Sequence, residues 1–158
     1  MFWDNSPHET GRFLSAVEKF RHQSLEGAAM LKGSCLCGGI QYEIEAELGP
    51  VTNCHCSQCR KASGAAFASN ASVSSAAFCF LTGAELLREW ESSPGVKRCF
   101  CGRCGSPILK RHDARPETVR LRLGTLDTDP RVKPSRHIYV ASKAPWVDIP
   151  VDGLPRSD

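Results

Sequence analysis

The placement of the cysteines constrains this chain more than any other feature of its sequence. Eight of the nine cysteines fall into three short clusters, and the ninth, Cys79, stands alone between two phenylalanines. The first 30 residues contain four acidic side chains and no apolar segment of the kind found in secretory signals. We therefore expect a cytoplasmic protein with reduced thiols, and cysteines at this density then indicate metal binding. Cys79 is expected to be a small buried hydrophobic residue.

Two of the clusters together supply four ligands for one ion. Cys101 and Cys104 are separated by two residues and followed by Gly105, which is the form of a zinc knuckle. Cys35 and Cys37 can complete a tetrahedral site. Because four thiolates leave no open position, we predict a structural zinc that ties an early strand to a late one and contributes to folding.

The remaining cluster places Cys54, Cys56 and Cys59 within six residues. Three protein ligands, with a fourth position left to water or substrate, are the pattern of a catalytic zinc. We therefore predict two zinc ions per chain, the second of them catalytic. Two other interpretations stay open. His55 or Cys99 would close the second site as a fourth ligand, although His55 lies between two ligands and is expected to point away. Alternatively, Cys56 and Cys59 form a redox pair, although the βαβ pattern of a thioredoxin is missing.

The rest of the chain predicts short strands around a small apolar core. Leu, Ile, Val and Phe make up 34 of 158 residues, close to the lower limit for an ordered domain. Ile40, Tyr42 and Ile44 alternate with polar residues, as in a half-buried strand. A short helical turn is predicted at residues 57–62, and residues 85–89 are compatible with strand or helix. Further strands are predicted at residues 67–73, 78–81, 86–90, 96–100, 119–123 and 137–140. This pattern predicts an all-β domain of antiparallel strands.

Residues 1–29 differ from the remainder of the chain. Ser6, Pro7 and Glu9 have the pattern of a helix start, and apolar residues then recur at helical spacing to about residue 25. We expect an N-terminal extension with an amphipathic helix, followed by one zinc domain over residues 30–158.

Hydropathy and charge argue against two classes of partner. The longest apolar run, Ala76 to Leu81, is too short to cross a membrane. From Lys97 to Lys143 there are 12 basic and 4 acidic residues, but they form no basic run and no recognisable reading helix. Nucleic-acid binding is therefore not expected. The sequence leaves the oligomeric state open.

The segments around the clusters are also recognisable as motifs. They read KGSCLCGGI at residues 32–40, CHCSQCR at 54–60 and FCGRCGS at 100–106. Together with residues 137–146 and 152–155, they resemble the glutathione-dependent formaldehyde-activating enzyme family, which includes centromere protein V. The resemblance covers residues 30–155 and implies an all-β, tent-like zinc-binding fold. It implies the same division of ligands, with Cys35, Cys37, Cys101 and Cys104 on a structural zinc and Cys54, Cys56 and Cys59 on a catalytic one.

The activity implied by this resemblance is carbon–sulfur bond formation or cleavage, in which formaldehyde and glutathione give S-hydroxymethylglutathione. The implied partners are a small thiol and an aldehyde. Since glutathione is anionic, five basic side chains are candidates for its carboxylates: Arg98, Arg103, Arg120, Arg122 and Lys143. The alternative is a non-enzymatic zinc-binding module in which both zinc ions are structural.

Overall fold

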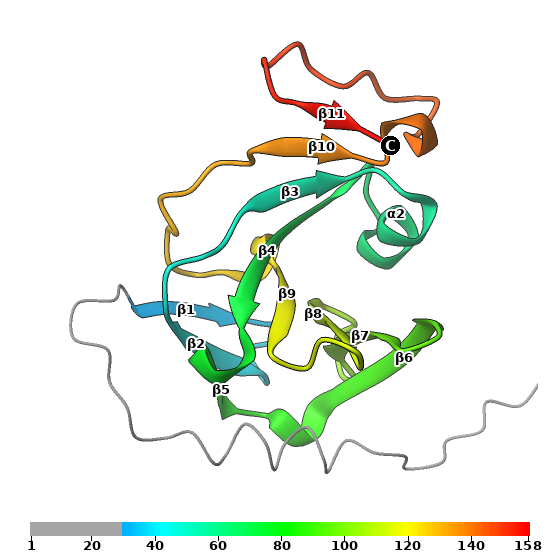
Figure 1. Cartoon of the computed structure of the whole chain (residues 1–158). Coiled ribbons are helices and arrows are strands. Elements are labelled where there is room, and N and C mark those ends of the chain that lie inside the picture. The colour runs from blue at the N-terminus through cyan, green and yellow to red at the C-terminus, as the bar shows by residue number, and fades with distance from the viewer. Residues whose placement is uncertain (1–29) are drawn as a thin grey trace, which may run out of the picture.

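The computed structural model describes residues 30–158 as two β-sheets and one α-helix (Figure 1). The predicted N-terminal helix falls in residues 1–29 and so lies outside the described residues. The prediction of an all-β domain is confirmed. No helix within residues 30–158 is long and apolar enough to span a bilayer.

The smaller sheet is antiparallel and has the strand order β1 (Met30–Ser34), β2 (Gln41–Glu45), β5 (Phe78–Thr82). The alternation predicted for β2 is confirmed: Tyr42 and Ile44 are fully buried, and the Tyr42 ring stacks on Phe78 with 4.9 Å between ring centroids. Gly33 permits this packing, because a Cβ at that position would lie 2.3 Å from the Tyr42 ring. The prediction that Cys79 is buried was wrong. It is half-buried, because β5 is an edge strand with one face turned outward.

The larger sheet has eight strands, and the α-helix α2 (Ser57–Ser63) connects its third and fourth strands in spatial order. The strands are, in spatial order, β11 (Arg156–Ser157), β10 (Arg136–Ile138), β3 (Val51–Cys54), β4 (Ala68–Ser74), β9 (Thr118–Arg122), β8 (Pro107–His112), β7 (Val96–Cys101) and β6 (Leu87–Ser93). β10 runs parallel to both β3 and β11, and the other neighbours are antiparallel. The prediction of antiparallel strands therefore fails at this edge, which the chain reaches through a long connection and not a hairpin.

The core lies between the smaller sheet and one face of β6–β9. Its fully buried members come from both sheets and include Ile40, Tyr42, Ile44, Leu87, Ile108, Leu109, Val119 and Leu121. Cys35 and Cys101 belong to the same buried cluster. The large sheet curves so that α2 and β6 lie on the two sides of its other, open face (Figure 1).

Most predicted strands are found within one or two residues of their predicted bounds. The ambiguous residues 85–89 divide between a 3₁₀ turn, η2 (Ala84–Leu86), and the start of β6. β1, β3, β8 and β11 were missed. All four residues of β3 are buried, so the strand shows no alternation, and β8 begins at a proline that reads as a turn residue. The remaining 3₁₀ turns are η1 (Ser75–Ala77), η3 (Leu123–Thr125) and η4 (Val140–Ser142).

Candidate metal centres and active-site pocket

The four-cysteine cluster, Cys35, Cys37, Cys101 and Cys104, is assembled from the turn after β1, the last residue of β7 and the turn that follows it. The four Sγ atoms all lie within 4.8 Å of one another. The Sγ of Cys37 lies 3.5 Å from that of Cys35 and 4.0 Å from that of Cys101. Sulfurs around a tetrahedral zinc, with Zn–S bonds of about 2.3 Å, would be about 3.8 Å apart, so the donor set fits this metal in number, chemistry and spacing.

Hydrogen bonds around this cluster stabilise negative charge on the Cys35 and Cys104 sulfurs. The Ile40 amide donates to the Cys35 Sγ at 3.2 Å. A 3.3 Å contact joins the Cys104 thiol to the Ser106 hydroxyl, and hydrogen bonding with Ser106 lowers the pKa of Cys104 to about 5. The Ser106 hydroxyl also accepts a 2.9 Å hydrogen bond from the Leu36 amide, which joins the two turns. Such surrounding contacts orient metal ligands.

The three-cysteine cluster, Cys54, Cys56 and Cys59, forms where β3 gives way to α2. Cys54 ends the strand, Cys56 is the N-cap of the helix, and Cys59 lies in its first turn. Their Sγ atoms also lie within 4.8 Å of one another, and the Cys59 amide donates to the Cys56 Sγ at 3.3 Å. The Cys54 thiol, as a hydrogen-bond partner, lowers the pKa of Cys59 to about 4, while the same contact raises that of Cys54. The cluster thus favours at least one thiolate, and its donor set fits zinc.

No fourth histidine, cysteine or carboxylate joins this cluster among residues 30–158. His55 turns away from it, as predicted, and its Nε2 lies 2.8 Å from Nδ1 of His137. His137 Nε2 in turn lies 2.9 Å from a carboxylate oxygen of Asp152. Cys99, the other predicted candidate, is buried against Glu89, with 3.3 Å between its Sγ and a carboxylate oxygen. Within the described residues, the three-cysteine cluster therefore has room for a ligand from outside the chain.

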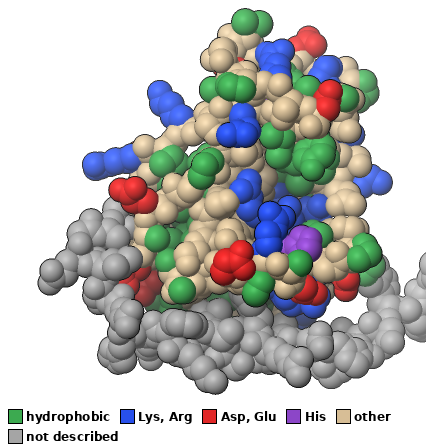
Figure 2. Space-filling model, viewed as in Figure 1, with side chains coloured by type: hydrophobic (Ala, Val, Ile, Leu, Met, Phe, Trp, Pro, Cys, Tyr) green, Lys and Arg blue, Asp and Glu red, His purple; other side chains and the backbone are tan. Residues whose placement is uncertain are grey.

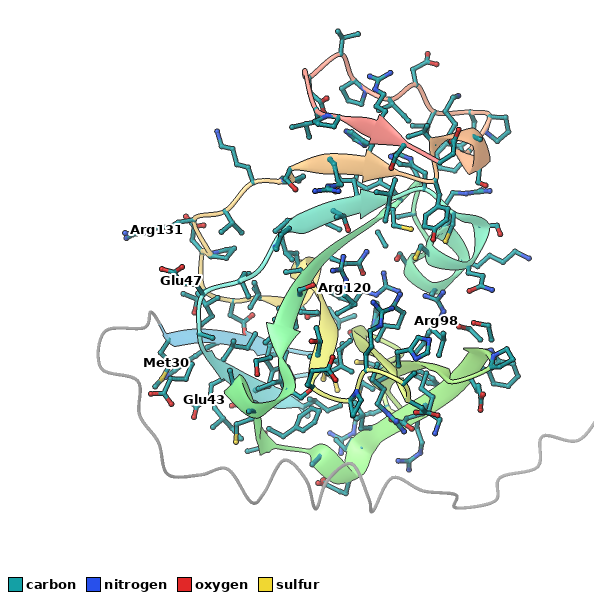
Figure 3. All side chains as sticks on the ribbon, in the orientation of Figure 1. Met30, Glu43, Glu47, Arg98, Arg120 and Arg131 are labelled. Atoms are coloured by element: carbon teal, nitrogen blue, oxygen red, sulfur yellow. The ribbon has the colours of Figure 1, made fainter. Side chains whose placement is uncertain are left out.

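The three-cysteine cluster lies in the wall of a pocket of about 420 Å³ on the open face of the large sheet. α2 forms one side through Ser57, Gln58 and Cys59. Arg98, Lys110 and Arg120 contribute basic side chains from β7, β8 and β9. Lys and Arg side chains gather near the middle of this face (Figure 2), and Arg98 and Arg120 both point into the space between α2 and β6 (Figure 3). A reactive sulfur centre and a basic wall thus share one pocket.

The family model for the glutathione-dependent formaldehyde-activating enzyme matches residues 30–142. The chain belongs to this family. A crystal structure of a Rhodobacter sphaeroides protein is similar, with a TM-score of 0.51 and 28% sequence identity over 63% of this chain and 92% of that one. No curated protein matches this chain. Family membership supports formaldehyde and glutathione as substrates, and the two cysteine clusters can hold metal ions.

Two of the five basic side chains predicted as candidates for glutathione binding line the pocket. These are Arg98 and Arg120. Arg122 is buried and donates to Asn70 at 2.8 Å, Arg103 is exposed, and the Lys143 ammonium donates to the Val147 carbonyl at 2.9 Å. Lys110 was missed, because its strand β8 was not recognised. Had β8 been paired with its neighbours, the register would have placed Lys110 between Arg98 and Arg120.

Proposed function

We propose that this protein catalyses the reversible addition of the glutathione thiol to formaldehyde, as a carbon–sulfur lyase working in the synthetic direction. The observation that carries the proposal is the three-cysteine cluster, which has no fourth protein ligand among the described residues and borders a pocket. The four-cysteine cluster is different: it has a full set of four ligands, and two of them, Cys35 and Cys101, are buried in the core.

Both clusters are proposed to hold zinc, two ions per chain. Cys35, Cys37, Cys101 and Cys104 would hold a structural ion, and Cys54, Cys56 and Cys59 a catalytic one. When bound by these three thiolates, zinc would supply an open ligand position at which a substrate thiol is deprotonated at neutral pH. Because thiolate clusters persist only where thiols stay reduced, the proposal includes a cytoplasmic location.

The reaction itself needs no oxidant. The glutathione sulfur forms a bond to the carbonyl carbon, the C=O π bond breaks with its electron pair moving to the oxygen, and the thiol proton ends on that oxygen. The chain's own residues contribute placement. The Cys59 amide and the Arg98 guanidinium, whose Nη1 lies 4.0 Å from the Cys59 Sγ, stabilise negative charge on the cluster. Tyr139 lines the same pocket with a left-handed φ of 58°, a conformation that is costly for a residue with a side chain.

The experiment that tests the proposal measures exchange between formaldehyde, glutathione and their adduct by NMR, with and without zinc-loaded protein. We expect faster exchange with protein present and zinc near two per chain by elemental analysis. Cys56→Ser should return exchange to the uncatalysed rate while the variant keeps the fold and one zinc. Cys79→Ser is the matched control, since Cys79 lies in neither cluster, and it should behave as wild type.

Two results would contradict the proposal. Unchanged exchange with fully metallated protein would exclude a role in this reaction. Unfolding of Cys56→Ser, with Cys79→Ser intact, would show that the second metal is structural and would favour the alternative of a non-enzymatic zinc-binding module.

A further inference from the structure

Arg98, Lys110 and Arg120 form a continuous row across three strands. Arg98 of β7 is directly opposite Lys110 of β8, and Lys110 is directly opposite Arg120 of β9. All three line the pocket beside the three-cysteine cluster. Like charges at directly opposed positions of an antiparallel sheet repel and destabilise it. The basic row is therefore a cost to the fold that its own strands do not offset.

On the opposite face of the same strands, the neighbouring basic residues are paired with acidic side chains. There, Lys97 is opposite Arg111. Arg111 makes a two-pronged contact with Glu89 at 2.7 Å, and Asp113 contacts both Arg111 at 2.8 Å and Lys97 at 3.5 Å. The chain thus neutralises adjacent cations where they do not face the pocket.

Within residues 30–158 the basic row has no carboxylate partner. The Arg98 Nη1 lies 4.0 Å from the Cys59 sulfur, and the other hydrogen-bond partners of the row are neutral. Arg98 donates to the Gln58 amide oxygen at 3.0 Å, and Arg120 donates to the hydroxyls of Thr52, at 2.9 Å, and Ser72. No ion pair joins Arg98, Lys110 or Arg120 to a carboxylate in this part of the chain, and no Asp or Glu lines the pocket.

The charges in and against the pocket add up to an excess of three positive charges, because the buried Arg122 guanidinium also interacts with the Cys59 sulfur. Three thiolates and one divalent ion would leave the three-cysteine cluster with a charge of −1, against +3 from the basic row and +1 from Arg122. A dicarboxylic thiol that binds as its thiolate brings three negative charges and would neutralise this excess. An ammonium group would find no carboxylate in the pocket wall and would lie among cations.

We propose that the basic row selects the thiol substrate by its two carboxylates, and that the amino group of glutathione is not recognised. The substrate class of this site is then a dicarboxylic thiol, of which glutathione is one member. This inference rests on the proposed function, but it concerns which thiol enters the pocket and not whether the thiol reacts.

The test compares thiols that differ in one charged group at a time. N-acetylglutathione lacks the ammonium but keeps both carboxylates, and glutathione diethyl ester keeps the ammonium but masks both carboxylates. In the exchange assay, the half-saturating concentration of N-acetylglutathione should equal or fall below that of glutathione. That of the diester should be higher by at least about tenfold.

Lys110→Met links the preference to the basic row. It should raise the half-saturating concentration of glutathione by about tenfold and leave that of the diester unchanged. Lys133→Met, at an exposed lysine outside the pocket, is the matched control and should change neither. If N-acetylation abolishes the use of the thiol, or if the diester serves as well as glutathione, the inference is wrong.

Binding without reaction separates this inference from the proposed function. S-methylglutathione and its N-acetyl and diester forms cannot add to formaldehyde, and their binding to zinc-loaded protein can be followed by ligand-detected NMR. If S-methylglutathione and its N-acetyl form bind and the diester does not, but no exchange is catalysed, the proposed function is refuted and the dicarboxylate preference is retained. If exchange is catalysed but all three forms bind equally well, the proposed function is retained and the dicarboxylate preference is refuted.

Discussion

Neutralising the middle of the basic row should stabilise the fold while it weakens substrate binding. Lys110 has a like charge directly opposite on each side, Arg98 and Arg120, and burial lowers the pKa of its amine. The protein therefore holds a charged lysine where the charge is unfavourable. Lys110→Met removes the charge and keeps an unbranched side chain of similar length along the sheet.

The expected gain follows from the two opposed pairs. Each like-charge pair costs about 0.2–1 kcal/mol, so removing both should raise the free energy of unfolding by about 0.4–2 kcal/mol. For a domain of this size, 1 kcal/mol corresponds to a rise in melting temperature of about 2–4 °C. A residue that serves only the fold would show the opposite sign, because its removal would lower stability.

Urea unfolding followed by circular dichroism, in buffer that keeps both clusters metallated, measures this change. Lys133→Met again serves as the control and should leave the midpoint unaltered. The reasoning would be refuted if Lys110→Met lowered the unfolding midpoint with an unchanged slope. It would also be refuted if the variant bound glutathione as tightly as wild type, since the unfavourable charge of Lys110 would then contribute nothing to glutathione binding.

Other parts of the structure give three more expectations. Asp152→Asn removes the charged partner of His137 and should lower the melting temperature at neutral pH. The hydrogen bond to His137 lowers the pKa of Asp152 below its usual 3.8, so the stabilisation that it provides is lost as the pH falls. A difference in melting temperature from wild type that persists in acid would contradict this role. Gly33→Ala would place a Cβ 2.3 Å from the Tyr42 ring and should lower the free energy of unfolding in urea by about 2 kcal/mol or more. Gly124→Ala, with open space around its Cβ, is the control and should lower it much less. Equal unfolding midpoints for the two variants would show that β1 and β2 have room for the added methyl group. A chelator should remove metal in two phases, the first from the three-cysteine cluster without loss of circular dichroism and the second with unfolding, and release in a single phase would argue against two kinds of site.

The cysteine spacing predicts both clusters, but for a different reason in each case. Cys54, Cys56 and Cys59 lie within six residues, and a strand end followed by a helix N-cap is enough to bring their sulfurs together. The four-cysteine cluster needs a long-range pairing, but the number of ligands that tetrahedral zinc requires leaves few ways to make it. Metal coordination thus supplies a rule that connects distant residues without knowledge of the fold.

No comparable rule was available for the contacts around the three-cysteine cluster. His137 reaches His55 because β10 lies parallel to β3, and Asp152 in turn contacts His137. The short and irregular C-terminal segment does not signal this pairing. Lys110 was missed for a related reason, since β8 begins at a proline and was not predicted as a strand. Both omissions arise from strand pairing between residues far apart in the chain, which single-sequence patterns describe poorly.

The two halves of the site are therefore encoded at different levels of structure. The sulfur centre is encoded by local spacing, whereas the basic row exists only because the β7–β8–β9 register places Arg98, Lys110 and Arg120 side by side. Side chains alternate between the faces of a strand, so a one-residue slip would turn Lys97 and Arg111 toward the pocket and bring their acidic partners with them. It follows that substitutions in the basic row can change which thiol is bound without disturbing the cysteines. Substitution of Cys54, Cys56 or Cys59 would remove a ligand of the proposed catalytic metal but leave the charge of the sheet face intact.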